Sequence, residues 1–137
     1  MKSLNKLFVF IGIFLLASCN TGTTNKSYEL AEAGKHYTTL NFIASADELR
    51  EATIDALTLR KWSLSRQGDA IVAKINHRGV DGRLYITFAT DTIHINSKGS
   101  NIDNVPIVPI RLIDSLNKTI RKQLYKNKQR KNNTNTN

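Results

Sequence analysis

The chain of 137 residues has a single cysteine, Cys19, and only two prolines and one tryptophan. One cysteine excludes an intrachain disulfide, so the apolar core must hold the fold without a covalent cross-link. The longest apolar run, from Leu7 to Leu16, covers about ten residues, roughly half of what a membrane-spanning helix needs. A permanent transmembrane anchor is therefore not expected.

Residues that mark catalytic or metal centres are also scarce. The only histidines are His36, His77 and His94, and no two of them have the i, i+3 or i, i+4 spacing of a helical metal pair. The serines lack a glycine elbow, and Gly79 and Gly82 flank a turn without a phosphate-loop pattern. We therefore predict no catalytic residue, no metal and no cofactor, and a hydrolase would need an unrecognised site.

What is present begins with an export signal. Lys2 and Lys6 precede the apolar run, and the small residues Ala17 and Ser18 follow it. This order of a charged start, an apolar middle and a small-residue exit is typical of a secretory signal peptide. The sequence predicts four segments, which are a signal peptide (1–18), a flexible polar tether (19–36), a single domain (37–125) and a disordered, basic and Asn-rich tail (126–137).

Two segments of the domain have helical periodicity. A capping box, Ser45 with Glu48, predicts a helix that continues to about Arg60. A second helix is expected from about Ile107 or Ile110 to about Lys126. The expected buried stripes are Leu49, Ala52, Thr53, Ala56 and Leu57 in the first helix, and Ile113, Leu116, Ile120 and Leu124 in the second.

Between these helices the apolar period changes to two, which predicts strands over 62–66, 70–77, 83–90 and 93–97. Residues 36–43 are either an edge strand or a lead-in. Trp62, at the corner between helix and strand, is either a core anchor or a ligand-stacking residue. The predicted fold is α+β, a two-layer sandwich of an antiparallel meander of three to four strands with two helices on one face.

The alternation also predicts which strand residues face away from the helices. With Leu84, Ile86 and Phe88 directed inward, the opposite face is expected to present Tyr85, Thr87, His94 and Asn96. Two interpretations remain open. The four residues are either an ordinary solvated face or a small polar binding surface.

Positive charge is concentrated at the C-terminal end. From Arg111 onward eight Lys and Arg residues stand against Asp114 alone, whereas residues 19–110 carry ten charges of each sign. The predicted basic patch is Arg121, Lys122, Lys126, Lys128, Arg130 and Lys131. This patch is either a solubilising end or a site for lipid headgroups, lipopolysaccharide phosphates or cell-wall carboxylates, since an exported protein does not normally meet nucleic acid.

The segment Leu16-Ala17-Ser18-Cys19 resembles the lipobox of bacterial lipoproteins. The resemblance implies cleavage before Cys19, a lipid on the Cys19 sulfur and acylation of the new amino terminus. By the same resemblance, Asn20 in place of aspartate favours the periplasmic face of the outer membrane over the inner membrane. The alternative is a chance thiol at the end of an ordinary cleaved signal.

The layout of the whole chain is similar to small bacterial lipoproteins of uncharacterised function, with a lipobox followed by one α-β-β-β-α domain. The segments that carry this resemblance are Leu59-Arg60-Lys61-Trp62, residues 68–73 and residues 97–102. The last helix lacks the aromatic start that is frequent in the family. The resemblance implies a fold and supplies no catalytic residues.

Together these features predict an exported, lipid-anchored, non-enzymatic envelope protein that binds a protein or another envelope component. Its expected partners are the membrane, through the N-terminal lipid, and an envelope protein or anionic polymer. The alternative is electrostatic binding to anionic lipid, lipopolysaccharide or cell wall through the basic C-terminal helix and tail.

Overall fold

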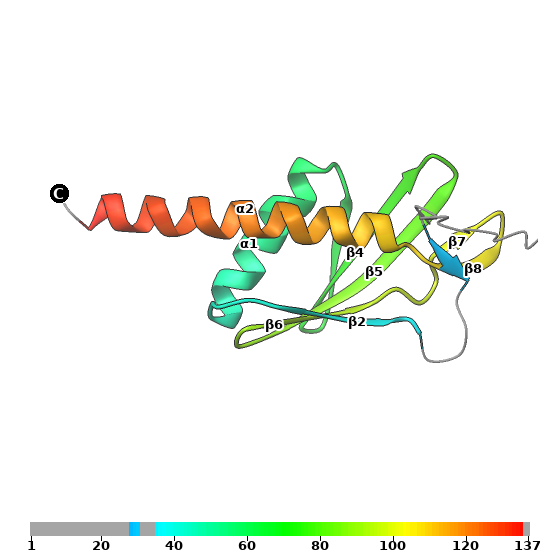
Figure 1. Ribbon diagram of the computed structural model, residues 1–137, viewed down its shortest axis with the longest axis horizontal. Coiled ribbons are helices and arrows are strands. Elements are labelled where there is room, and N and C mark those ends of the chain that lie inside the picture. The colour runs from blue at the N-terminus through cyan, green and yellow to red at the C-terminus, as the bar shows by residue number, and fades with distance from the viewer. Residues whose placement is uncertain (1–27, 31–34, 136–137) are drawn as a thin grey trace, which may run out of the picture.

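The computed structural model describes residues 28–30 and 35–135. Cys19, the predicted signal peptide and most of the predicted tether lie outside these residues. The described chain forms an α+β fold with an antiparallel sheet of eight strands and two helices (Figure 1). In chain order the elements are β1 (Glu29–Leu30), β2 (Tyr37–Asn41), α1 (Ala46–Leu59), β3 (Ser63–Gln67), β4 (Ala70–His77), β5 (Val80–Ala89), β6 (Thr92–Asn96), β7 (Asn101–Ile102), β8 (Val105–Val108) and α2 (Ile110–Thr134).

Helix α1 begins at the capping box that the sequence predicts. The backbone N–H of Glu48 donates to Ser45 Oγ at 3.3 Å, and the backbone N–H of Ser45 donates to Glu48 Oε2 at 3.0 Å. These bonds to Ser45, the backbone bond first, hold the pKa of Glu48 below its ordinary value. The predicted stripe is confirmed, because the buried residues of α1 are Leu49, Ala52, Thr53, Ala56 and Leu57.

The central meander, β3 to β6, is also confirmed, and residues 37–41 form a strand that pairs with β6. The prediction of three to four strands was nevertheless too low. The loop expected over 98–104 contains a hairpin, in which Asp103 (φ 49°) and Asn104 (φ 65°) turn β7 into β8. Asp and Asn tolerate positive φ, and strands of two residues show no periodicity that a sequence could reveal.

Part of the predicted tether is a strand as well. Glu29 and Leu30 form β1, which pairs with β8 in the register Glu29↔Val108 and Leu30↔Ile107. Two residues of an otherwise polar segment are too few to show the periodicity of a strand, and their partner strand, β8, is distant in the sequence. The tether prediction was therefore wrong for these two residues.

The sheet forks at β5. The C-terminal part of β5 pairs with β6 over Tyr85–Ala89, and its N-terminal end pairs with β7 over Val80–Asp81. In the gap between these partners, the fully buried Ser100 takes the place of a strand. Its hydroxyl accepts from the Arg83 backbone N–H and donates to the Arg83 carbonyl, both at 2.9 Å. One side chain thus satisfies both backbone groups where the two branches separate.

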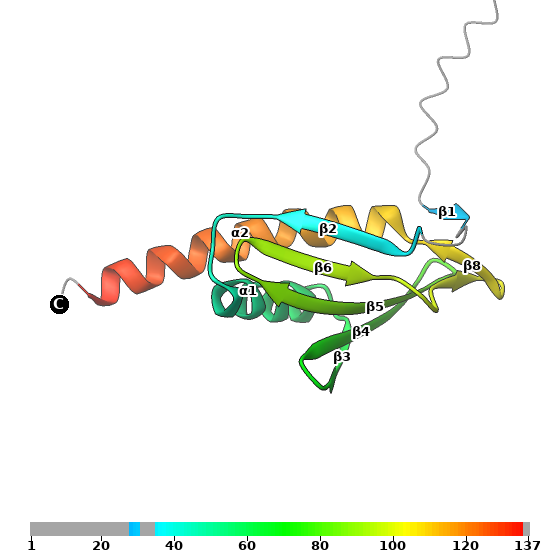
Figure 2. The same cartoon turned by 90° about the horizontal axis from the view of Figure 1, so that it is seen from below.

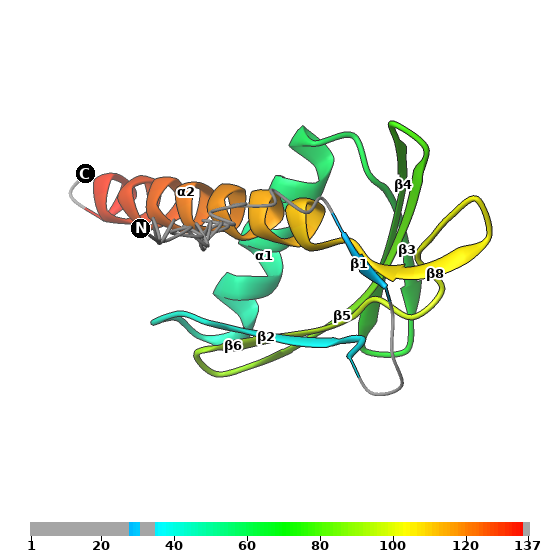
Figure 3. The same ribbon diagram turned by 45° about the vertical axis from the view of Figure 1, so that its right-hand side comes forward.

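Both helices lie on the same side of the sheet, and Figures 2 and 3 show the sheet bending around that side. The core between the layers contains the inward residues of α1, α2 and the central strands, among them Leu84, Ile86, Ile93 and Ile95. Trp62 is buried, which confirms its role as a core anchor. Gly82 lies beside Trp62 and allows close packing, since a Cβ at Gly82 would lie 3.0 Å from Leu112 Cδ1 and 3.1 Å from Ile75 Cγ2.

Helix α2 begins after Pro109, and its predicted stripe of Ile113, Leu116, Ile120 and Leu124 is buried. It does not end near Lys126, however, and the disorder predicted for 126–137 is wrong for residues 126–134, which are helical. Tertiary contacts explain the difference. The buried Asn127 donates from Nδ2 to Asp55 Oδ2 at 3.0 Å, and Lys128 Nζ donates to the carbonyl of Ile43 at 2.9 Å. Composition alone cannot reveal these partners.

Candidate functional site: basic surfaces and an arginine-lined pocket

The four predicted face residues meet on the side of the sheet opposite the helices. Tyr85 lies directly across from Asn96, and Thr87 across from His94, in the two rungs of β5 and β6 on either side of the Ile86–Ile95 rung. Strand β2 extends these rungs with residues of the same face, Tyr37 beside Asn96 and Thr39 beside His94. The sequence therefore predicted a real cluster and missed its continuation onto β2.

Hydrogen-bonding groups dominate this face. Thr39 Oγ1 and His94 Nδ1 lie 3.4 Å apart, and Asn96 Oδ1 accepts from the Lys98 backbone N–H at 2.9 Å. The Arg83 guanidinium lies over the Tyr85 ring, 5.0 Å from its centroid. Such a face can hydrogen-bond to a partner.

The predicted basic patch divides into two groups. Three of its members join α2 to the rest of the domain. Arg121 donates from Nη2 to the carbonyl of Asn41 at 3.0 Å and stacks over the Phe42 ring, while Lys128 bonds to Ile43. Lys131 forms an ion pair of 3.6 Å with Glu51 of α1. These three cations are structural contacts of the helix.

The other members point away from the domain. Lys122, Lys126 and Arg130 are exposed and spaced four residues apart, and the exposed Lys118 begins the same row. Positions four apart lie one above the next on a helix surface. We call these four residues the basic row, and none of them has an ion pair within the described chain. The sequence prediction missed Lys118 because it considered only the end of the helix.

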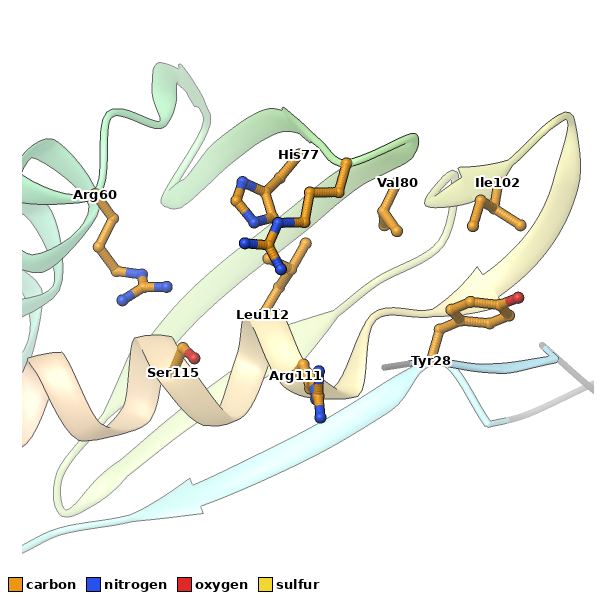
Figure 4. Close-up of a pocket in the computed structure, with 9 residues that line it drawn as sticks. Tyr28, Arg60, His77, Val80, Ile102, Arg111, Leu112 and Ser115 are labelled. Atoms are coloured by element: carbon orange, nitrogen blue, oxygen red, sulfur yellow. The ribbon is translucent and has the colours of Figure 1, made fainter. Parts of the chain in front are cut away.

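A pocket of about 240 Å³ lies at the opposite end of α2 (Figure 4). Three arginines that are distant from one another in the sequence line this pocket. Arg60 follows α1, Arg78 lies in the turn between β4 and β5, and Arg111 belongs to the first turn of α2. His77, Ser115 and Tyr28 add further polar groups. Among the residues that the structure describes, none with an acidic side chain lines this pocket.

The three guanidinium groups have no ion pair within the described chain. The Nε atom of Arg60 is buried without a hydrogen-bond partner, and its Nη1 lies 3.5 Å from Thr119 Oγ1. Sequence reasoning missed this pocket, because only the fold assembles it. The sequence did contain one signal of an anion site. Arg111 is a cation in the first turn of a helix that has no acidic residue there, and a cation at this position is unfavourable with respect to the helix dipole.

Other kinds of site find no support in the described part of the chain. It contains no group of three or more His, Cys, Asp or Glu side chains that could hold a metal ion. No helix among the described residues is long and apolar enough to cross a membrane. Comparison of the chain with protein-family models, curated proteins and solved structures gave no match. The function is therefore argued from the chemistry of the described surfaces.

Proposed function

We propose that the protein is a lipid-anchored, non-enzymatic protein of a bacterial envelope whose helix α2 lies against an anionic surface. The supporting observation is the basic row. Lys118, Lys122, Lys126 and Arg130 are exposed and free of ion pairs in the described chain, while the other cations at this end of α2 bind the domain. A row of cations without ion pairs, on a helix whose other cations at this end bond to the domain, favours an external anionic partner.

The geometry of the basic row suits a flat surface. Its ends, Lys118 and Arg130, are twelve residues apart, or about 18 Å at a rise of about 1.5 Å per residue. Each Lys or Arg near an anionic lipid surface contributes about 1 kcal/mol, so the basic row contributes about 4 kcal/mol. Without a partner, like charges four residues apart destabilise a helix slightly. Tyr125, which is 66% exposed between these cations, suits the headgroup level of a bilayer.

A short connection to the anchor fits this arrangement. Tyr28 follows Cys19 by nine residues, and an extended chain spans at most about 3.3–3.6 Å per residue, or roughly 30 Å in total. A single acyl chain binds a membrane only marginally, and a basic surface is a common second signal. The lipobox and Asn20 make the periplasmic face of the outer membrane the proposed location.

Vesicle co-sedimentation tests the basic row. The chain from Asn20 onward should bind phosphatidylglycerol vesicles and not phosphatidylcholine vesicles, and salt should weaken the binding. The triple variant K118Q/K122Q/K126Q should bind about 100-fold more weakly, because it loses three contributions of about 1 kcal/mol. The matched control, R66Q/K74Q/K98Q, removes three exposed charges elsewhere and should bind like the unmodified chain. Equal losses in both variants would show that net charge, and not the row, determines binding.

Metabolic labelling tests the anchor. Cells fed a fatty-acid probe should label the protein and should fail to label a Cys19→Ser variant. An unlabelled protein, or a processed chain that begins elsewhere than at Cys19, would overturn the lipid anchor and leave the basic row to be judged separately.

A second candidate function is protein binding by the sheet face opposite the helices. The observation that supports it is that two rungs of the β5–β6 ladder present four polar side chains together, those of Tyr85, Asn96, Thr87 and His94. A photo-cross-linking side chain at Thr87 should yield a discrete adduct in intact cells. The same group at Gln67, in the exposed strand β3, should yield none. Persistence of the Thr87 adduct after His94→Ala and Tyr85→Ala substitutions would argue against specific recognition by this face.

A further inference from the structure

The arginine-lined pocket is a separate site from the basic row, with which it shares no residue. Arg60, Arg78 and Arg111 line one hollow from the end of α1, the β4–β5 turn and the start of α2, and Figure 4 shows Arg60 and Arg111 at different sides of it. Three guanidinium groups repel one another, and none of the described lining residues supplies a carboxylate to balance them. This clustering of cations favours an anion from outside.

The first turn of α2 strengthens this preference. Pro109 occupies the N-cap position and provides no side-chain hydrogen bond, and no acidic residue stands in the first turn. The Ile113 N–H bonds to the Pro109 carbonyl, but the N–H groups of the three preceding helical residues have no partner within the helix. The positive end of the helix dipole and these N–H groups attract an anion at the same place as the arginines.

The arrangement of donors selects a phosphate over a carboxylate. Three arginines line the hollow from three different parts of the fold, and Ser115 and Tyr28 line it as well. A planar carboxylate offers two oxygens, whereas a phosphate group offers oxygens in tetrahedral directions that donors from several sides can reach. Arg is also the side chain that most often recognises phosphate with paired N–H bonds.

The remaining lining indicates that the phosphate carries an organic group. Val80, Ile102 and Leu112 supply an apolar wall beside the arginines. The volume of about 240 Å³ is below the roughly 300–1,000 Å³ of pockets for drug-sized ligands, so the ligand part that enters is small. We propose that this pocket binds the phosphate group of a small organic phosphoester, either free or as a lipid headgroup.

The test uses the full chain in a non-ionic detergent that contains no phosphate. Glycerol 3-phosphate titrated by calorimetry should bind, and the amide resonances of Arg111 and Leu112 should shift on binding. The variant R78Q/R111Q, at two exposed positions, should weaken binding by about tenfold or more, because hydrogen bonds to charged groups are lost. The control variant R66Q/K98Q loses the same charge and should bind glycerol 3-phosphate as the unmodified chain does.

A second probe distinguishes the two sources of the phosphate. Binding of short-chain phosphatidylglycerol that R78Q/R111Q weakens, without binding of glycerol 3-phosphate, would assign the pocket to a lipid headgroup. Binding of glycerol 3-phosphate alone would assign it to a free phosphoester. Binding of neither probe, or equal binding by R78Q/R111Q and the unmodified chain, would overturn the proposal. If the double variant failed to fold, R111Q and R78Q singly would make the same comparison. Loss of vesicle binding in the K118Q/K122Q/K126Q variant alone would leave the pocket untouched, so the two proposals fail separately.

Discussion

The hydrogen bond between Asn127 and Asp55 gives a direct test of why α2 continues beyond Lys126. Asn127 is only 7% exposed, and its Nδ2 donates to Asp55 Oδ2 at 3.0 Å, joining the late turns of α2 to α1. The substitution Asn127→Ala removes the donor and leaves a partly buried carboxylate without it. We expect this change to destabilise the whole fold and to loosen the last turns of α2.

The expected magnitude follows from two opposing effects. A hydrogen bond to a charged group contributes about 1.5–3 kcal/mol to stability. Alanine is a better helix former than asparagine by up to about 0.7 kcal/mol. The net loss for Asn127→Ala is therefore about 1–2 kcal/mol, which would lower the melting temperature of a domain of this size by several degrees.

Urea unfolding of Asn127→Ala, Asp55→Ala and the double variant measures the coupling between the two side chains, which we expect to be about 1 kcal/mol or more. Asn133→Ala is the matched control, since Asn133 is exposed in the same helix and its replacement should change stability by less than about 0.5 kcal/mol. A coupling energy near zero, or equal effects at Asn127 and Asn133, would refute the explanation that this pair holds the end of α2.

Three further predictions concern the core and the helix cap. Trp62→Ala should destabilise the domain by about 3–5 kcal/mol in urea unfolding, because it empties a buried site; a change below about 1 kcal/mol would contradict its burial. Gly82→Ala should destabilise it by about 1–3 kcal/mol, since the new Cβ meets Leu112 and Ile75, and retention of the wild-type melting temperature would show that these neighbours yield freely. Ser45→Ala should destabilise it by about 1 kcal/mol at neutral pH. Because the Ser45 bonds lower the pKa of Glu48 in the folded state, their stabilising effect is complete above the ordinary glutamate pKa and is lost as the pH falls through the lowered one. The urea midpoints of Ser45→Ala and the wild type should therefore approach each other in acid, and a constant difference would exclude an electrostatic part.

The features that the sequence predicted well are those with a local signal. The capping box at Ser45, the buried stripe from Leu49 to Leu57 and the alternation through Leu84, Ile86 and Phe88 each depend on the spacing of neighbours along the chain. The outward cluster of Tyr85, Thr87, His94 and Asn96 followed from the same alternation once two adjacent strands were assumed to pair.

The features that the sequence did not predict depend on partners that are distant in the chain. Strands β1, β7 and β8 have two to four residues each and exist because they pair with one another and with β5. The last turns of α2 are rich in Lys and Asn, and their order comes from Asp55, Ile43 and Glu51. The pocket cations Arg60, Arg78 and Arg111 become neighbours only after folding, and no local spacing connects them.

The short ladder between β1 and β8 has a mechanical consequence for the N-terminal lipid anchor that we propose. Tension on the N-terminal chain reaches the domain first at the two-residue ladder of β1 and β8, which can peel apart bond by bond. Once β1 has separated, the load passes along the chain to β2, which is joined to β6 of the central meander by a longer ladder over Tyr37–Asn41. The β1–β8 ladder can therefore open under force while the helices and the main sheet stay folded.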